Sequence, residues 1–221
     1  GSPLCFPLAL KYTATVKLHQ LFYGCADKAM PHRPHQSGKM VFTIFGTVAP
    51  RKGQDIFLDA IELLPDALRH KAIFRIVGSA FTEAKAVIFY NNICAKAALI
   101  PEVERVESMP PDQLLKFYAE TDVLVSASRE DPMPIVVTEG LMFSKACLCS
   151  SAIGHAQLLE DGKNGLIFAN ESAEELSKKM AWIINNPTEM AALGIAGRKV
   201  YEKYFLMSGF VNNVGNLMQF R

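Results

Sequence analysis

The stretch "MVFTIFGTVAPRKGQDIFLDAIELL", residues 40–64, decides the fold that we expect for this chain. Its first part is a run of β-branched and aromatic residues that ends in Gly46, which is typical of a buried strand. Its last part repeats apolar residues at three- and four-residue spacing, so they share one face of a helix. A strand that leads through a short loop into an amphipathic helix is the first part of a parallel βαβ unit.

The same alternation continues along the rest of the chain. Further strands are expected at residues 72–78, 103–108, 122–128, 146–150 and 166–168. Helices are expected at residues 54–64, 81–99, 110–120, 135–144, 172–186 and 187–204, with a short helix and turn at 155–165. Parallel strands joined by helices predict an α/β fold, a Rossmann-like doubly wound parallel sheet of about six strands.

Composition limits the classes of function that the chain can have. Half of its 221 residues are hydrophobic, which is enough for one large domain with a sizeable core. Its 23 Lys and Arg against 22 Asp and Glu give a net charge of +1, so no overall field attracts nucleic acid or an anionic membrane. No run reaches the roughly 18 apolar residues that a membrane-spanning helix needs. The opening "GSPLCF" lacks Met and resembles a scar of tag removal, so we expect an excised piece of a longer protein.

No metal site is expected from the cysteines and histidines. The five cysteines fit no zinc-binding spacing, and reduced core cysteines of a cytosolic protein are the favoured interpretation. We expect the side chains of Cys147 and Cys149 on opposite faces of one strand. His32 and His35 lie in a polar, Pro-rich loop, where no neighbouring residue completes a metal site.

Ligands of a doubly wound sheet bind at the carboxyl ends of its strands, so the loops after the strands are the candidate sites. In the first loop, Gly46 allows close backbone approach, and Arg51 and Lys52 stand just before the start of a helix. Cations beside free helical N–H groups suit a phosphate or diphosphate, although the loop is neither G-x-x-x-x-G-K-[ST] nor G-x-G-x-x-G. Taken alone, a solvated basic turn explains this loop slightly better.

Two other loops give weaker signals. Gly78 ends the second strand and permits close approach, but glycine at a strand end is common. Ser150, Ser151, Gly154 and His155 lie between a strand and a helix, a geometry that suits anions. A histidine in this position is more often an ordinary polar loop residue than a catalyst.

The loop after the fourth strand carries acids on both sides of a rigid turn. Asp131 and its neighbour Glu130 precede Pro-Met-Pro, and Glu139 follows within the next helix. We expect free N–H groups at the start of that helix, including that of Met133. Two carboxylates on a rigid turn suit a polyhydroxylated ligand, because they accept strong hydrogen bonds from hydroxyl groups. The alternative, acids favoured by a helix N-terminus, explains Glu139 less well, because its apolar neighbours require a partner for the carboxylate.

In combination, "GTVAPRKG", "RIVGSA", "DVLVSASREDPMPIVVTEGLMFSKACLCS" and "IGHAQLLEDGKNGLIF" resemble the C-terminal, donor-binding domain of GT-B glycosyltransferases. The family resembled is family 4, the glycosyl transferases group 1, and the likeness runs from about Met40 to the C-terminus. It implies retaining transfer from a nucleotide-diphosphate sugar, UDP- or GDP-linked, without a bound metal or a separate cofactor.

The resemblance also implies roles for individual residues. Lys52 matches a lysine that contacts the diphosphate, Asp131 an acid that contacts sugar hydroxyls, and Glu139 an acid that contacts the ribose. Residues 107–109 fall where the family surrounds the base. The implied catalytic residues are Asp131, Glu139 and Lys52. The implied donor-binding residues are Gly46, Arg51, Lys52, Gly78, Ser108, Met109, Glu130, Asp131, Met133, Pro134, Ile135 and Glu139.

Three departures from the family pattern bear on donor binding. Thr47 stands where the family commonly has Arg, so one of two diphosphate cations is missing unless Arg51 replaces it. Asp131 stands where the family usually has Glu, one methylene longer, with Glu130 beside it. Pro-Met-Pro replaces a Gly-Phe-Gly type of loop.

The family's acceptor site lies in an N-terminal domain that this sequence lacks. We therefore expect residues 1–39 to hold the tag scar, the end of that domain and a linker, and residues 40–221 to form the nucleotide-sugar domain with its C-terminal helices. The whole protein would transfer a hexose to a glycan or lipid-linked acceptor in cell-surface polysaccharide synthesis, in the cytoplasm or peripherally at the inner membrane face. This piece alone would be inactive.

The sequence suggests two alternatives to this function. A degenerate domain that binds a nucleotide or a protein partner is favoured by Thr47 and Asp131. An unrelated α/β enzyme such as a UDP-sugar epimerase is disfavoured, because its G-x-G-x-x-G fingerprint is missing.

Overall fold

The structure is a computed structural model, and it describes residues 21–80 and 82–218. All six strands of its sheet are parallel, and the prediction of a doubly wound α/β fold is confirmed. The strands are β1 (Met40–Phe45), β2 (Ala72–Val77), β3 (Val103–Val106), β4 (Val123–Ser126), β5 (Ala146–Ser150) and β6 (Leu166–Phe168).

The strand order is β3-β2-β1-β4-β5-β6, so the winding of the chain reverses between β1 and β4. The connections that follow these two strands therefore leave in opposite directions along the sheet and open a crevice between them. The predicted loops after β1 and β4 flank this crevice.

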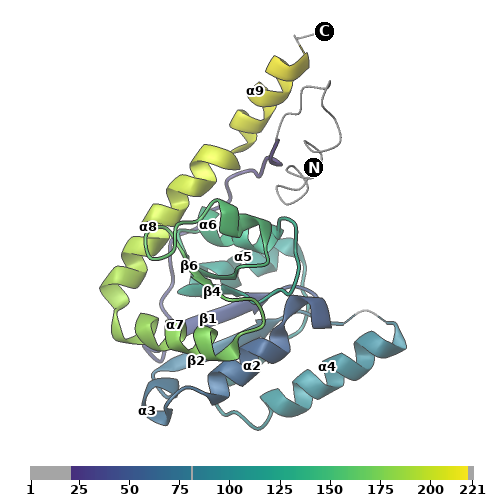
Figure 1. Ribbon diagram of the computed structural model, residues 1–221, viewed down its shortest axis with the longest axis vertical. Coiled ribbons are helices and arrows are strands. Elements are labelled where there is room, and N and C mark those ends of the chain that lie inside the picture. Colours follow the sequence, from purple (N-terminus) through teal and green to yellow (C-terminus); the bar gives the residue numbers. More distant parts are fainter. Residues whose placement is uncertain (1–20, 81, 219–221) are drawn as a thin grey trace.

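Helices cover both faces of the sheet (Figure 1). Helices α2, α4 and α7 pack on one face, while α5 and α6 pack on the other, and α8 lies against α6 and β5. The helices are α2 (Gln54–Glu62), α3 (Asp66–Arg69), α4 (Ala84–Ala97), α5 (Pro111–Glu120), α6 (Ile135–Met142), α7 (Ala173–Asn185), α8 (Pro187–Tyr204) and α9 (Met207–Met218), with 3-10 turns η2 (Pro50–Lys52) and η3 (Gly154–Gln157).

The two faces follow from the alternation of side chains along each strand. In β1, Phe42 and Ile44 enter the core beneath α2, whereas Phe45 enters the core beneath α5. Cys147 and Cys149 of β5 both lie in this second core. The expectation that they face opposite ways was wrong, because residues two apart in a strand share a face.

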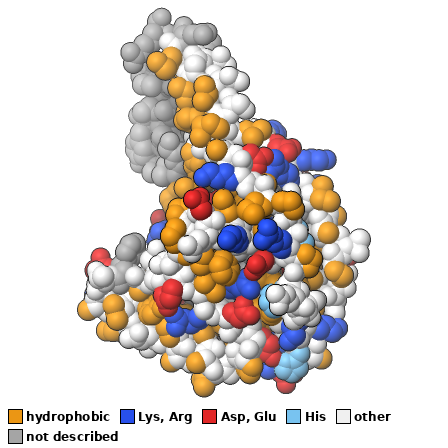
Figure 2. Space-filling view, turned by 180° about the vertical axis from the view of Figure 1, so that it is seen from behind, with side chains coloured by type: hydrophobic (Ala, Val, Ile, Leu, Met, Phe, Trp, Pro, Cys, Tyr) orange, Lys and Arg blue, Asp and Glu red, His pale blue; other side chains and the backbone are white. Residues whose placement is uncertain are grey.

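Two segments differ from the expected helices. Residues 155–165 form only the end of η3 and then turns that include Gly162, which has φ 78°. Helix α9 was not predicted, because "MSGFVNNVGNLM" contains glycine and asparagine, which are weak helix formers. It projects from the body of the molecule, and Figure 2 shows hydrophobic side chains along this projection, where Met207, Val211 and Met218 are exposed.

The described part of the predicted linker lies against the domain, while residues 1–20 are outside the described residues. The rings of Phe22 and Tyr23 lie 5.7 and 5.5 Å from that of Phe205, and the Cys25 N–H donates to the Phe205 carbonyl. Further along, the Arg33 N–H donates to the carbonyl of Ala119. The segment thus covers apolar side chains of α8 and its C-terminal end.

Across residues 21–80 and 82–218, no helix combines the length and the hydropathy that crossing a membrane requires.

Candidate functional site

The loops at the carboxyl edge of the sheet cross each other at glycines. Gly53, which precedes α2, has φ 71°, and a Cβ there would lie 2.0 Å from the carbonyl oxygen of Ala127. Gly78 follows β2 with φ 146°, and a Cβ there would lie 2.0 Å from the carbonyl oxygen of Gly46. Because both glycines permit backbone contact that no side chain allows, the loops after β1, β2 and β4 are held in fixed mutual positions.

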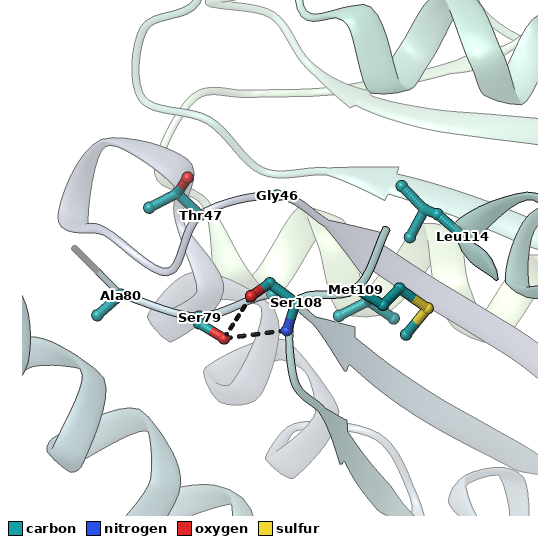
Figure 3. A pocket seen from close by; sticks show the side chains of 9 residues that line it. Gly46, Thr47, Ser79, Ala80, Ser108, Met109 and Leu114 are labelled. Carbon is teal, nitrogen blue, oxygen red and sulfur yellow. Dashed lines mark hydrogen bonds between the residues drawn. The ribbon is translucent and has the colours of Figure 1, made fainter. Parts of the chain in front are cut away.

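A hollow of about 280 Å³ opens beside these crossings (Figure 3). It brings together four of the predicted residues, Gly46, Gly78, Ser108 and Met109. Ser79 also lines it; its hydroxyl accepts a hydrogen bond of 3.0 Å from the Ser108 N–H and lies 3.1 Å from the Ser108 hydroxyl. The loops after β2 and β3 are thereby tied together, and small residues leave room for a flat ligand group between them.

The predicted cations lie at the crevice between β1 and β4, where they bind Asp131. Lys52 Nζ is 2.6 Å and Arg51 Nη1 is 3.3 Å from Asp131 Oδ2, and only 7% of Asp131 is exposed. Arg51 also donates to the carbonyl of Glu130, whose own side chain is exposed. The structure therefore joins the first and the fourth loop through an ion pair that their spacing in the sequence does not reveal.

The turn between the two acids is fixed by Asp131 and by the loop after β5. The Met133 N–H donates to Asp131 Oδ1 at 3.3 Å, so the expectation that this N–H is free was wrong. The Gly154 N–H donates to the carbonyl of Asp131 at 2.9 Å. Pro134 is the buried N-cap residue of α6, and the side chain of Ile135 is 59% exposed and thus accessible to a ligand.

Glu139 has the partner that its apolar surroundings require. The Tyr118 hydroxyl of α5 donates to Glu139 Oε2 at 2.5 Å. Burial raises the pKa of Glu139, and the hydrogen bond from Tyr118 acts in the opposite direction. Glu139 lines a second hollow, of about 290 Å³, and Leu114 lines both this hollow and the one at Gly46. The structure thus places Glu139 next to the first hollow and outside it.

Sequence reasoning missed several residues of this region, with Tyr118 the most informative. Its ring is stacked with those of Phe45 and Phe143, at 4.1 and 5.4 Å between centroids. Burial raises the pKa of Tyr118 well above its ordinary value, so it remains a proton donor. No local pattern marks a tyrosine inside an amphipathic helix, whereas Ser79 could have been found from its place directly after Gly78.

His155 is a core residue, contrary to the expectation of an ordinary polar loop residue. It is fully buried and stacked on Phe205, and its Nε2 lies 2.8 Å from the Thr138 hydroxyl. Burial lowers the pKa of His155 to about 3, so the ring is neutral at physiological pH. The hydroxyl of Thr138 also lies 2.6 Å from that of Tyr23, so this histidine helps to anchor the linker segment.

Within the described part of the chain, no group of three or more His, Cys, Asp or Glu side chains could hold a metal ion. The cations at the crevice are Lys52, with a side chain 19% exposed, and Arg51, with one 54% exposed. An anionic ligand at this edge would meet these two cations.

Comparison with known proteins identifies the family of the chain. The model of the family described as "Glycosyl transferases group 1" matches residues 26–200. An uncharacterized glycosyltransferase of Methanocaldococcus jannaschii is 25% identical over 173 residues, 77% of this chain and 46% of the relative. A lipopolysaccharide core biosynthesis mannosyltransferase of Rhizobium leguminosarum bv. viciae is 27% identical over 188 residues, 80% of this chain and 52% of the relative.

A third relative is the GDP-mannose-dependent alpha-(1-6)-phosphatidylinositol monomannoside mannosyltransferase of Mycolicibacterium smegmatis, 21% identical over 180 residues, 78% of this chain and 46% of the relative. The chain spans about half the length of the curated relatives it matches.

Solved structures have the same fold. Sucrose-phosphate synthase of Thermosynechococcus elongatus matches with a TM-score of 0.81 and 17% identity, over 96% of this chain and 56% of that one. The HepE protein of Anabaena, solved in complex with UDP and glucose, matches with a TM-score of 0.72 and 20% identity, over 82% of this chain and 48% of that one.

Proposed function

The chain belongs to the glycosyl transferases group 1 family, and from this premise we propose that it binds the nucleotide-sugar donor of a retaining glycosyltransferase. The observation that carries the proposal is the position of Lys52, Arg51 and Asp131 at the crevice between β1 and β4. A hollow of about 280 Å³ and a half-buried acid, Glu139, lie on either side of Leu114. Such convergence of cations, acids and an open hollow at a switch point suits an elongated ligand with a diphosphate in its middle.

The donor would extend along the carboxyl edge of the sheet. We assign the base to the hollow lined by Gly46, Gly78, Ser108 and Met109, and the ribose hydroxyls to Glu139. Lys52 and Arg51 take the diphosphate, while Asp131 and the turn from Met133 to Ile135 take the sugar. The HepE match, solved with UDP, supports a nucleotide donor. Because another relative depends on GDP-mannose, both UDP and GDP are candidates for the nucleotide of the donor.

In the proposed reaction, the bond between the anomeric carbon and the diphosphate oxygen breaks. A bond from the acceptor hydroxyl oxygen forms on the same face of the sugar, and the proton of that hydroxyl passes to the departing diphosphate. Negative charge grows on the diphosphate as it leaves, and Lys52 and Arg51 stabilise this charge from fixed positions.

In this proposal, the ion pair of Asp131 with Lys52 and Arg51 opens when the donor binds. Asp131 has both cations as partners. A diphosphate carries more negative charge than one carboxylate, so it would take Lys52 and Arg51 as partners and leave Asp131 to accept from sugar hydroxyls.

Acceptor and setting are further parts of the proposal. We propose that the full-length protein transfers a hexose to a glycan or to a lipid-linked acceptor in cell-surface polysaccharide synthesis. The relative that acts in lipopolysaccharide core biosynthesis supports this setting. The acceptor would bind a preceding domain, in the cytoplasm or peripherally at the inner membrane face. This chain alone should therefore bind the donor weakly and transfer nothing, and sustained transfer by the chain alone would contradict the proposal.

A melting-temperature series with UDP, GDP, ADP and their common sugars at millimolar concentration tests the site. A ligand that binds only the folded state raises stability by RT ln(1 + [L]/Kd). We expect a rise with one nucleotide family that Glu139→Ala removes and that Glu189→Ala, a change of an exposed acid on α8, retains. A rise that survives in Glu139→Ala would place the nucleotide elsewhere.

A second candidate function is a degenerate domain that binds a nucleotide or a partner without catalysis. Thr47 favours it, because this residue lines the hollow without supplying a cation. Normal donor affinity and turnover of the full-length protein would exclude this candidate.

A further inference from the structure

A third hollow, of about 560 Å³, lies at the opposite edge of the sheet. Asp122 and Lys145, which immediately precede β4 and β5, both line it. Its other walls come from the linker segment at Met30 and His32 and from α8 at Ile195. Because the donor site lies at the carboxyl ends of the same strands, this hollow is separate from it.

The hollow contains a buried cation, Lys145, which is only 4% exposed. Its Nζ lies 3.2 Å from the carbonyl oxygen of Ala119 and 3.0 Å from Nδ1 of His32. An ammonium group has three N–H donors, and neither of these neighbours is an anion. Burial lowers the pKa of Lys145 to about 8, although Asp122 acts in the opposite direction. The charged form is therefore poorly compensated, and a bound anion would stabilise it.

The other charged groups at the hollow are already paired. Asp122 accepts from the Val41 N–H at 2.8 Å and lies 3.2 Å from His32 Nε2. Arg198 binds the carboxylates of Asp27 and Glu202. Of the ion pairs within residues 21–80 and 82–218, none includes Lys145. This ammonium is thus the cation left for a ligand.

The remaining walls are largely apolar and determine the kind of anion. Met30, Met142, Phe143, Met190 and Ile195 surround the hollow, and Ile195 is 64% exposed. Ligand pockets commonly combine apolar walls with a few polar groups that orient the ligand. A single cation matches one carboxylate, whereas a phosphate dianion requires more donors than Lys145 supplies.

We propose that this hollow binds a small monocarboxylate with an apolar body, with the carboxylate on Lys145 and the body against Phe143 and α8. The site is independent of the donor site and of the proposed transferase activity. It would allow a second small molecule to bind at the amino edge of the sheet, against Met30 and His32.

Calorimetric titration with benzoate, benzamide and inorganic phosphate at neutral pH tests the charge requirement. Benzoate and benzamide have nearly the same shape, so their difference isolates the carboxylate. We expect benzoate to bind at millimolar concentration, about tenfold or more tightly than benzamide, and phosphate not to bind. In Lys145→Met the preference for benzoate should disappear. Equal binding of benzoate and benzamide, unchanged binding by Lys145→Met, or no binding of benzoate would overturn the proposal.

A pair of rim variants keeps the test valid if Lys145→Met fails to fold. Ile195 is exposed, so Ile195→Lys and Ile195→Glu should both fold. We expect benzoate binding to strengthen in the first and weaken in the second, by roughly two- to fivefold each, with benzamide unchanged in both. Identical benzoate affinities in the two variants would contradict a site for an anion at this hollow.

The protonation of Lys145 gives an independent measurement. Lysine labelled with ¹³C at Cε lets the pKa of Lys145 be followed by NMR with and without benzoate. Binding should raise the pKa of Lys145, because a carboxylate beside the ammonium favours its charged form. An unchanged pKa at saturating benzoate would show that the carboxylate lies elsewhere. Glu139→Ala, a change in the donor site, should leave the benzoate titration unaltered.

Discussion

The two edges of the sheet compensate their buried charges in different ways. At the carboxyl edge, Asp131 is paired with Lys52 and Arg51, and Glu139 accepts from Tyr118. At the amino edge, Lys145 is more deeply buried and contacts a carbonyl and an imidazole. We therefore expect that removal of the Asp131 charge weakens the fold and that removal of the Lys145 charge strengthens it.

The largest effect should come from Lys145 at alkaline pH. Its pKa in the folded chain is about 8, below the ordinary 10.5, so the unfolded chain binds the proton more tightly between these pH values. The free energy of unfolding contributed by this residue should therefore rise with pH across that window, by up to about 3 kcal/mol. Urea unfolding of wild type and Lys145→Met across this range, compared as a difference, isolates the contribution. A parallel pH dependence of the two proteins would contradict it.

Asp131→Ala should have the opposite sign and a slightly smaller effect. It leaves the partly buried Lys52 without its acid, so the free energy of unfolding should fall by about 2 kcal/mol. Glu130→Ala is the matched control, because the exposed Glu130 side chain is adjacent and only its main-chain carbonyl binds Arg51. We expect the control to change stability by less than about 0.5 kcal/mol in the same urea titration. Equal losses in the two variants would remove the distinction between the edges.

Glu139→Gln should separate stability from donor binding within the carboxyl edge. Burial raises the pKa of Glu139, so its ionised form lowers the stability of the fold at pH values above its ordinary pKa. The amide should melt at a higher temperature than wild type at neutral pH, and this advantage should vanish as the pH falls. Donor affinity should meanwhile drop about tenfold, because the amide forms weaker hydrogen bonds with ribose hydroxyls. A variant that is both less stable and unimpaired in binding would contradict both arguments.

The smallest effect is expected from restoring a cation at Thr47. Thr47 lines the hollow without supplying a charge, so Thr47→Arg should add a third cation and strengthen donor binding roughly three- to tenfold in a full-length protein. Thr47→Gln, which has a long but uncharged side chain, is the control. An Arg variant no better than Gln would show that a cation at this position does not contact the diphosphate.

Much of the fold was predictable because each strand and its following helix carry a local pattern. The β-branched runs that end in Gly46 and Gly78 predicted β1 and β2, and the regular spacing of apolar residues predicted α7 and α8. The same pattern placed Lys52 and Asp131 at one edge, since parallel strands end together. Helix α9 lacked such a pattern, because its glycines and asparagines disfavour a helix in isolation.

Contacts between distant segments were beyond sequence reasoning. The partners of Asp131 lie 79 and 80 positions away, and their distances depend on the close approach of the loops at Gly53. The environment of Lys145 depends on the linker, because His32 reaches it across 113 positions. A lysine before a strand resembles an ordinary solvated residue until the packing of another segment over it is known.

The linker segment also determines how far the chain can be shortened. A truncated version that begins at Met40 would match the boundary of the first strand, yet it would uncover Phe205 and remove the N–H donors of Cys25 and Arg33. Freshly exposed aromatic surface of this kind promotes self-association. The smallest fragment that keeps Phe205 covered should therefore begin before Phe22, well upstream of the first strand.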